Sequence, residues 1–306
     1  MNKKSILKSK IFQSPIVKTP LLFLDDAFWY CFQHGIKDDK RYLSLLYRMR
    51  FHRKLDWDNP KTFNEKLQWL KLYNHKPIYV TMADKYAVKE YVANIIGKEY
   101  VVPCLGVWET VDEIDFDILP EKFVLKVTHD SGGNIICKDK AQLDITAAKK
   151  TLAKRFNQDY YLSGRDKQYR DIPKKIIADQ FLDDHIGTEL RDYKFWCFNG
   201  EPKYMYFTNK GEDVYESFFD MDFNPVDIDH GFPRLNPEPE KPEEFELMKT
   251  LAAKLSQNIP FVRVDFFDVN HHVYFGEYTF FDWGGWKPFH GGWDEKLGNL
   301  IELPRN

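Results

Sequence analysis

A lysine inside a short apolar strand, followed directly by a glycine-bearing loop, constrains this 306-residue chain more than any other feature. The apolar runs Phe123–Val127 and Asn134–Cys137 flank a polar loop with two adjacent glycines. Runs of this length bounded by glycine predict a β-hairpin with the glycines at its tip. Lys126 lies inside the first run, where an ammonium group is costly to bury unless it meets an anion.

Two interpretations of this hairpin stay open at this point. Glycines let the backbone approach a ligand closely, and consecutive N–H groups can surround an anion, so the stretch is typical of a polyphosphate site. The other interpretation is an ordinary hairpin turn in which Lys126 extends its ammonium group to solvent. The stretch by itself does not decide between them.

Composition excludes several classes of protein. The net charge of −3 argues against a dedicated nucleic-acid binder. The four cysteines show no CxxC spacing, which indicates reduced thiols rather than a zinc site or a disulfide framework. No apolar run reaches 18 residues, so we expect a cytoplasmic protein. The basic N-terminus favours a frayed, solvated tail over residues 1–20 and at most a peripheral membrane contact.

Helical and strand patterns follow one another along the chain. Thr62-Phe-Asn-Glu65 is a capping box that predicts a helix, and a second helix over residues 84–96 ends at Gly97. Further helices are expected after Asp144 and after Pro242, whereas residues 158–174 and 211–240 have the composition of irregular segments.

Residues 192–207 form the clearest hairpin in the sequence, with Asn199-Gly200 as a two-residue turn. Pairing Phe198 with Glu201 separates a charged face from an apolar face. The charged face then holds Asp192, Lys194, Lys203 and Met205, and the other holds Tyr193, Phe195, Cys197, Tyr204 and Tyr206.

The last two predicted strands, Phe261–Asp268 and Val273–Phe281, have charged side chains at alternate positions. Arg263 and Asp265 project from one face of the first strand, and Glu277 and Thr279 from one face of the second. A two-residue turn at residues 270–271 places Asp265 and Glu277 on opposite faces of the sheet. A three-residue turn at 270–272, or an equivalent bulge, brings them together.

Two facing carboxylates repel each other unless a cation lies between them, so we predict the second arrangement if Asp265 and Glu277 share Mg²⁺ ions. The alternative is that one carboxylate simply faces solvent. If the pair holds metal, Asp265→Asn and Glu277→Gln abolish turnover with little loss of folding stability, since each relieves the repulsion between facing charges.

The order of these features resembles the ATP-grasp superfamily, which includes D-alanine–D-alanine ligase. The segments ADKYAVKEYV, FVLKVTHDSGGNIICK, DYKFWCFNGEPKY, PFVRVDFF and VYFGEYTFF are similar to the TupA-like ATP-grasp family of teichuronopeptide and capsular-polysaccharide biosynthesis. The resemblance runs from about Leu45 to Phe281. It implies an α+β ATP-grasp fold in which two lobes clasp ATP. The implied units are a tail and helical extension (1–80), an N-terminal subdomain (81–120), a lid lobe (121–185) and a catalytic lobe (186–306).

The resemblance also implies a nucleotide site. Lys85 and Lys126 would hold the phosphates of ATP under a mobile loop, 128–134. The strand that links the lobes would pair its backbone with adenine, although ATP-grasp proteins usually have glutamate where this chain has Asp179. Asp192 would accept the ribose hydroxyls. The loop glycines with their serine are Ser131, Gly132 and Gly133, and the linking strand is Asp179, Gln180, Phe181 and Leu182.

The implied catalytic residues are Arg263, Lys126 and Lys194. Arg263 would steady the transferring phosphoryl group, and Lys194 would reach a phosphate. Asp265 and Glu277 would hold Mg²⁺, with Thr279 where the superfamily commonly has asparagine. The implied reaction joins a carboxylate to an amine through an acyl phosphate, and the family indicates a uronic-acid saccharide and an amino acid or amine as the substrates.

Two other functions stay open. A capsule glycosyltransferase that uses a nucleotide sugar would need an acidic metal motif, and Asp220-Met-Asp222 has that form. A nucleotide-binding module without catalysis is the third possibility, against which the Arg263, Asp265 and Glu277 set argues. Three tryptophans of the C-terminal segment fit either a sugar site or the packing of a glycine-rich tail; they are Trp283, Trp286 and Trp293.

Overall fold

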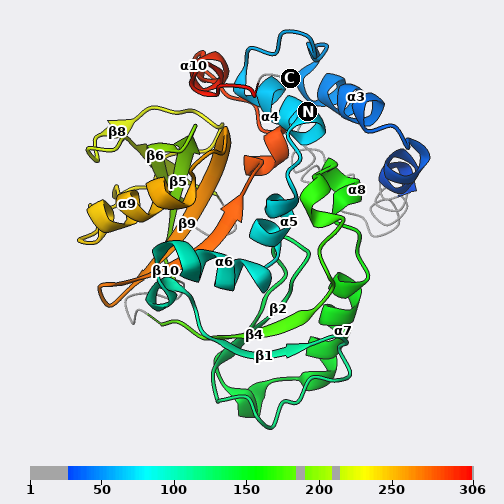
Figure 1. Cartoon of the computed structure of the whole chain (residues 1–306), viewed down its shortest axis with the longest axis vertical. Coiled ribbons are helices and arrows are strands. Elements are labelled where there is room, and N and C mark those ends of the chain that lie inside the picture. The colour runs from blue at the N-terminus through cyan, green and yellow to red at the C-terminus, as the bar shows by residue number, and fades with distance from the viewer. Residues whose placement is uncertain (1–26, 184–189, 209–213, 305–306) are drawn as a thin grey trace, which may run out of the picture.

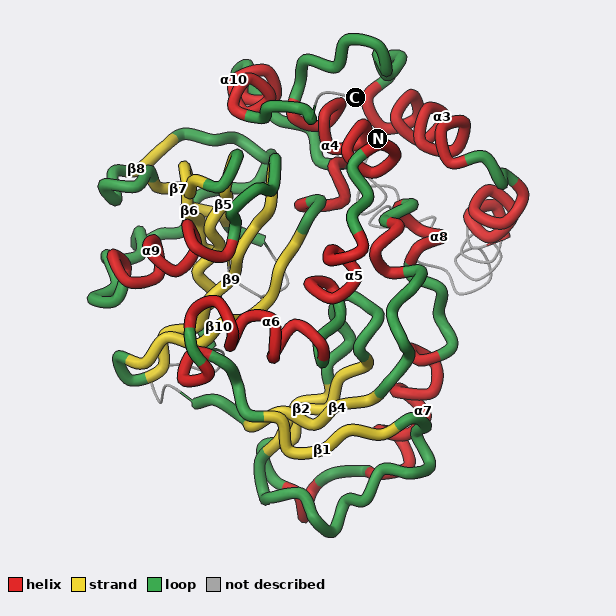
Figure 2. Tube along the Cα trace, in the orientation of Figure 1, coloured by secondary structure: helices red, strands yellow, loops and turns green. Residues whose placement is uncertain are grey.

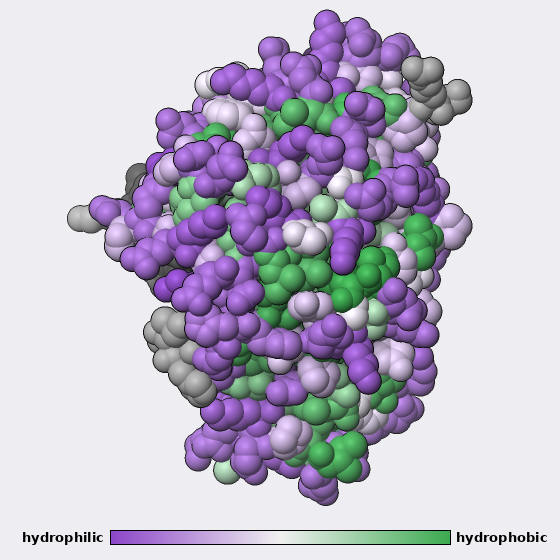
Figure 3. Space-filling model, turned by 60° about the vertical axis from the view of Figure 1, so that its left-hand side comes forward, coloured by the Kyte–Doolittle hydropathy of each residue, from purple (hydrophilic) through white to green (hydrophobic). Residues whose placement is uncertain are grey.

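The computed structural model describes residues 27–183, 190–208 and 214–304. Figures 1 and 2 show three parts, which are a helical layer at the top, a larger sheet at the left and a smaller sheet at the bottom. The expected tail, residues 1–20, lies outside the described residues. Hydrophobic side chains form separate patches on the mostly hydrophilic face in Figure 3. In the described part of the chain, no helix is long and apolar enough to cross a bilayer.

The helical layer is built from both ends of the chain. Residues 27–35 are helical, and α3 (Asp39–Phe51) and α4 (Phe63–Tyr73) follow. The capping box is confirmed, since Thr62 and Glu65 each accept a hydrogen bond from the other's backbone N–H. Helix α10 (Trp293–Leu300) packs on α4 at Gly298, where an added Cβ atom would collide with the backbone of Lys61 and Thr62.

The smaller sheet has four strands in the order β1-β4-β2-β3, all antiparallel. The predicted glycine-tipped hairpin is confirmed as its β2–β3 pair. Apolar side chains of β2 and β4 pack against Leu152 of α7. The bounds of these elements are β1 (Cys104–Trp108), β2 (Phe123–Val127), β3 (Ile135–Cys137), β4 (Ile176–Gln180) and α7 (Ile145–Phe156).

The larger sheet has six strands in the order β10-β9-β5-β6-β7-β8. One face packs on α9 and α6, and the other packs on α4 and α10, so the sheet is buried on both sides. The bounds are β5 (Asp192–Phe198), β6 (Glu201–Thr208), β7 (Glu216–Phe219), β8 (Pro225–Val226), β9 (Phe261–Val269), β10 (His272–Thr279), α6 (Ala87–Ile96) and α9 (Phe245–Leu255).

Two segments expected to be irregular contain secondary structure. Strands β7 and β8 lie within residues 211–240, and the two phenylalanines of β7, Phe218 and Phe219, are buried in the core of the larger sheet. Residues 158–174 contain the short helix α8 (Tyr161–Gly164) and the 3₁₀ turn Lys167–Tyr169.

The β5–β6 hairpin has the predicted turn but not the predicted faces. Asn199 and Gly200 have φ values of 50° and 87°, which suit the two-residue hairpin turn. A bulge at Lys203 then shifts the register, because Trp196 pairs with Tyr204 while Cys197 pairs with Pro202. The assignment of Met205 to the charged face is therefore wrong. Tyr206 faces Lys194 instead, since one extra residue exchanges the two faces of a strand.

The proposed subdomain 81–120 contributes to both sheets. Helix α6 buries Val88, Val92 and Ile96 in the core of the larger sheet, whereas β1 pairs with β4 in the smaller one. In Figure 1, α6 and α5 (Pro77–Ala83) lie between the two sheets. The boundaries at 80, 120 and 185 remain a proposal.

Candidate active site

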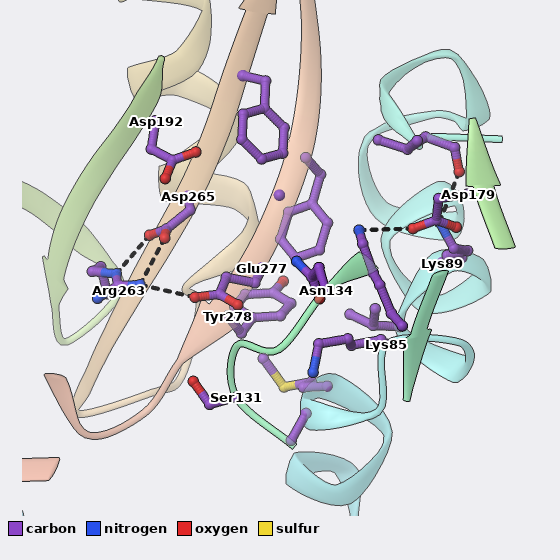
Figure 4. A pocket seen from close by; sticks show the side chains of 18 of the residues that line it. Lys85, Lys89, Ser131, Asn134, Asp179, Asp192, Arg263, Asp265, Glu277 and Tyr278 are labelled. Atoms are coloured by element: carbon purple, nitrogen blue, oxygen red, sulfur yellow. Dashed lines mark hydrogen bonds and ion pairs between the residues drawn. The ribbon is translucent and has the colours of Figure 1, made fainter. Parts of the chain in front are cut away.

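A cavity of about 330 Å³ lies between the two sheets, where both contribute charged side chains. Figure 4 shows Arg263, Asp265 and Glu277 on one side of it and Lys85, Lys89 and Asp179 on the other. Its charged lining within the described residues comprises five cations and five carboxylates, namely Lys85, Lys89, Lys126, Lys194, Arg263, Asp130, Asp179, Asp192, Asp265 and Glu277.

Asp179 joins two lysines on the side of the smaller sheet. Val124 pairs with Asp179, so Lys126, two residues further along β2, projects from the same face of the sheet. Lys126 Nζ lies 2.9 Å from Asp179 Oδ2, and Lys89 Nζ lies 2.9 Å from Asp179 Oδ1. Lys89 is absent from the sequence prediction. Its signal was the spacing of four residues from Lys85, which brings two side chains to one face of a helical turn.

Asp130 fixes the first half of the glycine-bearing loop. Lys85 Nζ donates to the backbone oxygen of Asp130 and lies 3.3 Å from its Oδ1. Burial raises the pKa of Asp130 and lowers the pKa of Lys85, and the attraction between the two charges opposes both shifts. Residues 128–130 are buried, and only Ser131 to Asn134 reach the surface. Mobility is therefore expected of residues 131–134 rather than of the whole predicted loop.

The carboxylates of the last hairpin face each other, as predicted, but by the second of the two routes. The turn has two residues, Asn270 and His271, with φ values of 52° and 63°, so the prediction of a three-residue turn is wrong. A bulge at Gly276 adds one residue to β10, so that Asp265 pairs with Glu277 and the two side chains project from the same face. An added Cβ atom at Gly276 would lie 3.1 Å from the backbone oxygen of Asp265.

Arg263 binds the carboxylates of this hairpin. Its Nε lies 2.7 Å from Asp265 Oδ1, its Nη2 lies 2.7 Å from Asp265 Oδ2, and its Nη1 contacts Asp282. Burial raises the pKa of Asp265 to about 6, although Arg263 and Lys194 act in the opposite direction. Lys194 Nζ lies 2.8 Å from Asp192 and 4.0 Å from Asp265.

Comparisons with known proteins identify the family. The model of the TupA-like ATPgrasp family matches residues 65–302. The chain belongs to the TupA-like ATP-grasp family. It therefore has the ATP-grasp fold, and the matched region includes most of α4 and all of α10 from the helical layer.

Among solved structures, the TupA-like chain is similar to the D-alanine–D-alanine ligases of Helicobacter pylori and of Bacillus anthracis, the latter complexed with ATP. Each shares 13% sequence identity with it at a TM-score of 0.39. The matches cover 72% and 65% of this chain and 59% and 55% of the two ligases, so the chain spans less than two thirds of their length. No curated protein matches the chain.

The residues of this TupA-like protein fit a magnesium ion held partly by a nucleotide. Arg263 Nη2 lies 2.7 Å from Asp265 Oδ2 and 2.9 Å from Glu277 Oε1, so both carboxylates reach one cationic position. Thr279 Oγ1 lies 3.2 Å from Glu277 Oε1. Mg²⁺ commonly takes one or two protein carboxylates and completes its shell with phosphates and water. Among the described residues, no group of three or more His, Cys, Asp or Glu side chains could hold a metal ion by itself.

Some of the predicted site residues do not line the cavity. Among its described lining residues are Ser131 and Gly132 but not Gly133, which lies beside the guanidinium of Arg155. Of the predicted linking strand, only Asp179 is among the described residues that line the cavity, and β4 ends at the next residue, Gln180. The backbone N–H of Gln180 donates to Pro103 at 2.9 Å.

Thr279 lines a second cavity, of about 480 Å³, which adjoins the first. The two cavities share Ser131, Tyr169, Lys194, Arg263 and Glu277. Two of the three C-terminal tryptophans, Trp283 and Trp286, line the second cavity, whereas Trp293 packs against Tyr204.

Sequence reasoning missed three residues around Arg263. Asp282 accepts hydrogen bonds from Trp196 Nε1 at 2.9 Å and from Tyr206 at 3.1 Å. Asp282 lies in a 3₁₀ turn after the last strand, where the alternation of side chains along a strand no longer predicts which way a side chain points. Tyr206 was assigned to the opposite face because the bulge at Lys203 has no sequence signal of its own. Tyr169 reaches both cavities from a segment expected to be a loop.

Proposed function

We propose that this protein is an ATP-dependent carboxylate–amine ligase that joins an amine or amino acid to the carboxylate of a uronic-acid saccharide. One observation carries the proposal. Cations from both lobes converge on a single cavity, opposite a pair of facing carboxylates. A cytoplasmic location and a role in capsule or polysaccharide synthesis belong to the same proposal.

The residues divide between the nucleotide and the metal. Lys85, Lys89 and Lys126 hold the phosphates, and the backbone of residues 179–182 pairs with adenine. Asp192 accepts the ribose hydroxyls. Asp265 and Glu277 hold Mg²⁺, which supplies neutralisation of phosphate charge when bound. The oxygen of Thr279 orients Glu277 through their 3.2 Å contact.

Charge balance supports this assignment. Five cations and five carboxylates line the cavity, and they pair with one another as Lys126–Asp179, Lys85–Asp130 and Arg263–Asp265. ATP with two Mg²⁺ ions is also neutral. Binding therefore exchanges ion pairs within the site and buries no net charge, which avoids the cost of an unpaired ion in a dry cavity.

The reaction proceeds in two transfers. A carboxylate oxygen of the saccharide attacks the γ-phosphorus of ATP, and ADP leaves. The amine then attacks the acyl carbon, phosphate leaves, and the nitrogen loses a proton. Arg263 and Lys194 lie where the two cavities meet, and they position the phosphoryl group and offset its charge.

The glycosyltransferase alternative finds no support at its motif. Asp220 accepts hydrogen bonds from the backbone of Asp222 and Asn224 at 3.0 and 2.8 Å, so its carboxylate shapes the turn between β7 and β8. Neither aspartate of Asp220-Met-Asp222 is among the described residues that line the two cavities.

Two measurements test the proposal. Thermal shift should show stabilisation by ATP with Mg²⁺ and none by nucleotide sugars. Phosphate release from ATP should then depend on both a uronic acid and an amine, screened as pairs. A protein stabilised by nucleotide sugars but not by ATP would contradict the ligase assignment. ATP binding without phosphate release for any pair of substrates would indicate a nucleotide-binding module without catalysis.

A further inference from the structure

The proposed ligase reaction needs a group that takes a proton from the amine, and the following inference rests on that reaction. Near neutral pH an amine is an ammonium ion, whose nitrogen has no electron pair for attack until one proton has left. A carboxylate in contact with the nitrogen is a suitable acceptor. The second cavity is lined by four carboxylates among the described residues, namely Asp166, Glu216, Glu277 and Asp282.

Three of these carboxylates are paired with a lysine or an arginine. Asp166 lies 2.8 Å from the buried ammonium group of Lys71. Arg263 pairs with the other two, because its Nη2 lies 2.9 Å from Glu277 and its Nη1 contacts Asp282. A proton placed on any of the three would weaken an ion pair, so none of them is well suited to receive one.

Glu216 differs because a histidine holds it. Its Oε2 lies 2.9 Å from His230 Nδ1, and an ionised carboxylate only accepts hydrogen bonds, so His230 donates. Its Oε1 is buried and has no hydrogen-bond partner within the described residues. Lys287 attracts Glu216 electrostatically, but the two form no ion pair in the described part of the chain. A buried oxygen without a partner is costly, and an ammonium group that enters the cavity would supply the missing donor.

The register of the larger sheet places Glu216 on the same face as Lys194. Paired residues of neighbouring strands project from one face, and so do residues two positions apart on one strand. Lys194 pairs with Tyr206, and Thr208, two residues beyond Tyr206, pairs with Glu216. Glu216 therefore lies two strands away from Lys194, or roughly 10–12 Å at the usual spacing of strands and residues. One ligand can span that distance.

Aromatic rings in the second cavity also favour a cation. The faces of such rings attract a positive charge within about 6 Å of the ring centre. Trp283 and Trp286 line the cavity, and the ammonium group of Lys71 already lies 4.9 Å from the centre of the Trp286 ring. The wall of this cavity therefore suits the ammonium group of an amine.

We propose that Glu216 is the catalytic base of the second transfer and that His230 is its positioning residue. Glu216 Oε1 binds the ammonium group of the amine and takes one proton from it. The electron pair left on nitrogen forms the bond to the acyl carbon, and the bond from that carbon to the phosphate oxygen breaks with its electrons on phosphate. The departing phosphate takes the second proton from nitrogen, and Glu216 gives its proton to water when the amide leaves.

Hydroxylamine separates this role from a structural one, because it is neutral near neutral pH and needs no base before it attacks. The unmodified protein and Glu216→Gln receive ATP, Mg²⁺ and the uronic acid and amine that release phosphate fastest in the screen above, or hydroxylamine in place of that amine. Glu216→Gln should slow amide formation at least about a hundredfold and keep hydroxamate formation within about threefold. Raising the pH should recover part of the loss, because more of the amine is then already deprotonated.

Two further variants separate the outcomes. Glu201→Gln is the matched control and should change neither rate, since Glu201 pairs with Lys203 and lines neither cavity among the described residues. His230→Phe removes the donor but keeps a ring beside Phe289, whose centre lies 4.2 Å from that of His230, and it should slow amide formation more than hydroxamate formation.

The ratio of the two rates decides. Amide and hydroxamate formation that both stay at the parent rate in Glu216→Gln, or that fall equally, would overturn this inference and leave the ligase proposal standing. An unmodified protein that forms no product with either nucleophile would overturn the ligase proposal itself. If Glu216→Gln fails to fold, His230→Phe is judged by the same ratio.

Discussion

Arg263 pairs with two carboxylates, Asp265 and Glu277, and the fold depends more strongly on the first of these pairs than on the second. Asp265 accepts two hydrogen bonds from Arg263 and is 4% exposed, whereas the side chain of Glu277 is 45% exposed. Removing one partner of a buried pair leaves the other without its full complement of hydrogen bonds.

Asp265→Asn is expected to lower the free energy of unfolding by about 1–3 kcal/mol, because a neutral amide replaces a doubly bonded carboxylate. Glu277→Gln should cost less than about 1 kcal/mol, as for an exposed ion pair. Both should abolish phosphate release. This revises the expectation from sequence that either change spares stability. Urea denaturation measures the difference, and equal stability of the two variants would contradict it.

Lys126→Ala should weaken Mg-ATP binding by about 1.5–3 kcal/mol, the scale of a lost charge-assisted hydrogen bond. Calorimetric titration of ATP gives the change. Lys203→Ala is the matched control, since Lys203 pairs with exposed Glu201 on β6 and lines neither cavity among the described residues. Unchanged affinity in Lys126→Ala would remove the hairpin lysine from the nucleotide site.

At the residue scale, sequence reasoning identified most of the charged side chains in the first cavity. It succeeded where a charge interrupts an apolar strand, as at Lys126, because burial of an isolated charge demands a partner. It did not find Asp130 or Asp282, since a polar residue in a loop or turn is ordinary on sequence grounds and only its burial makes it unusual.

At the scale of elements, one glycine sets the geometry of the last hairpin. The two-residue turn alone would send Asp265 and Glu277 to opposite faces, and the bulge at Gly276 restores them to one. Sequence predicted that some such device exists, because the charge pattern requires it. The sequence could not distinguish a three-residue turn from a bulge, because both leave the same alternation of charged and apolar residues in the strand that follows.

Gly276→Ala should reduce phosphate release more than it reduces stability. The added methyl group would lie 3.1 Å from the backbone oxygen of Asp265 and 3.2 Å from the Phe267 ring, so β9 or β10 must shift by a few tenths of an ångström. The expected cost in stability is about 1 kcal/mol. Gly35→Ala, which meets nothing within 4 Å, is the control. Full activity of Gly276→Ala would show that the bulge tolerates displacement.

At the scale of the whole molecule, a buried lysine of the helical layer contacts residues that line the second cavity. Lys71 of α4 donates to the backbone oxygens of Gly164 and Gly284 at 2.9 and 2.8 Å and pairs with Asp166 at 2.8 Å. Burial lowers the pKa of Lys71, and the attraction of Asp166 opposes that shift. Each hydrogen of the ammonium group therefore has an acceptor in a segment that lines the cavity.

No sequence pattern predicts this contact. Lys71 precedes Asp166 by 95 positions and Gly284 by 213, and a lysine between Leu70 and Leu72 carries no sequence signal that its side chain is buried. The family resemblance indicates the order of the elements, whereas the packing of α4 on the residues around the second cavity depends on long-range contacts such as this one. The fold class was therefore predictable, and the walls of the second cavity were not.

Lys71→Met should lower the free energy of unfolding by about 3–5 kcal/mol, because it leaves the carboxylate of Asp166 buried without a cation. The double variant Lys71→Met with Asp166→Asn should recover part of that loss, since no uncompensated charge remains. Lys66→Met on the same helix is the matched control, because Lys66 donates to Gly298 and Ile301 at 2.9 and 2.8 Å, away from both cavities. Urea denaturation measures these effects, and a Lys71→Met protein as stable as the parent would show that the carboxylate of Asp166 does not need Lys71 as its partner.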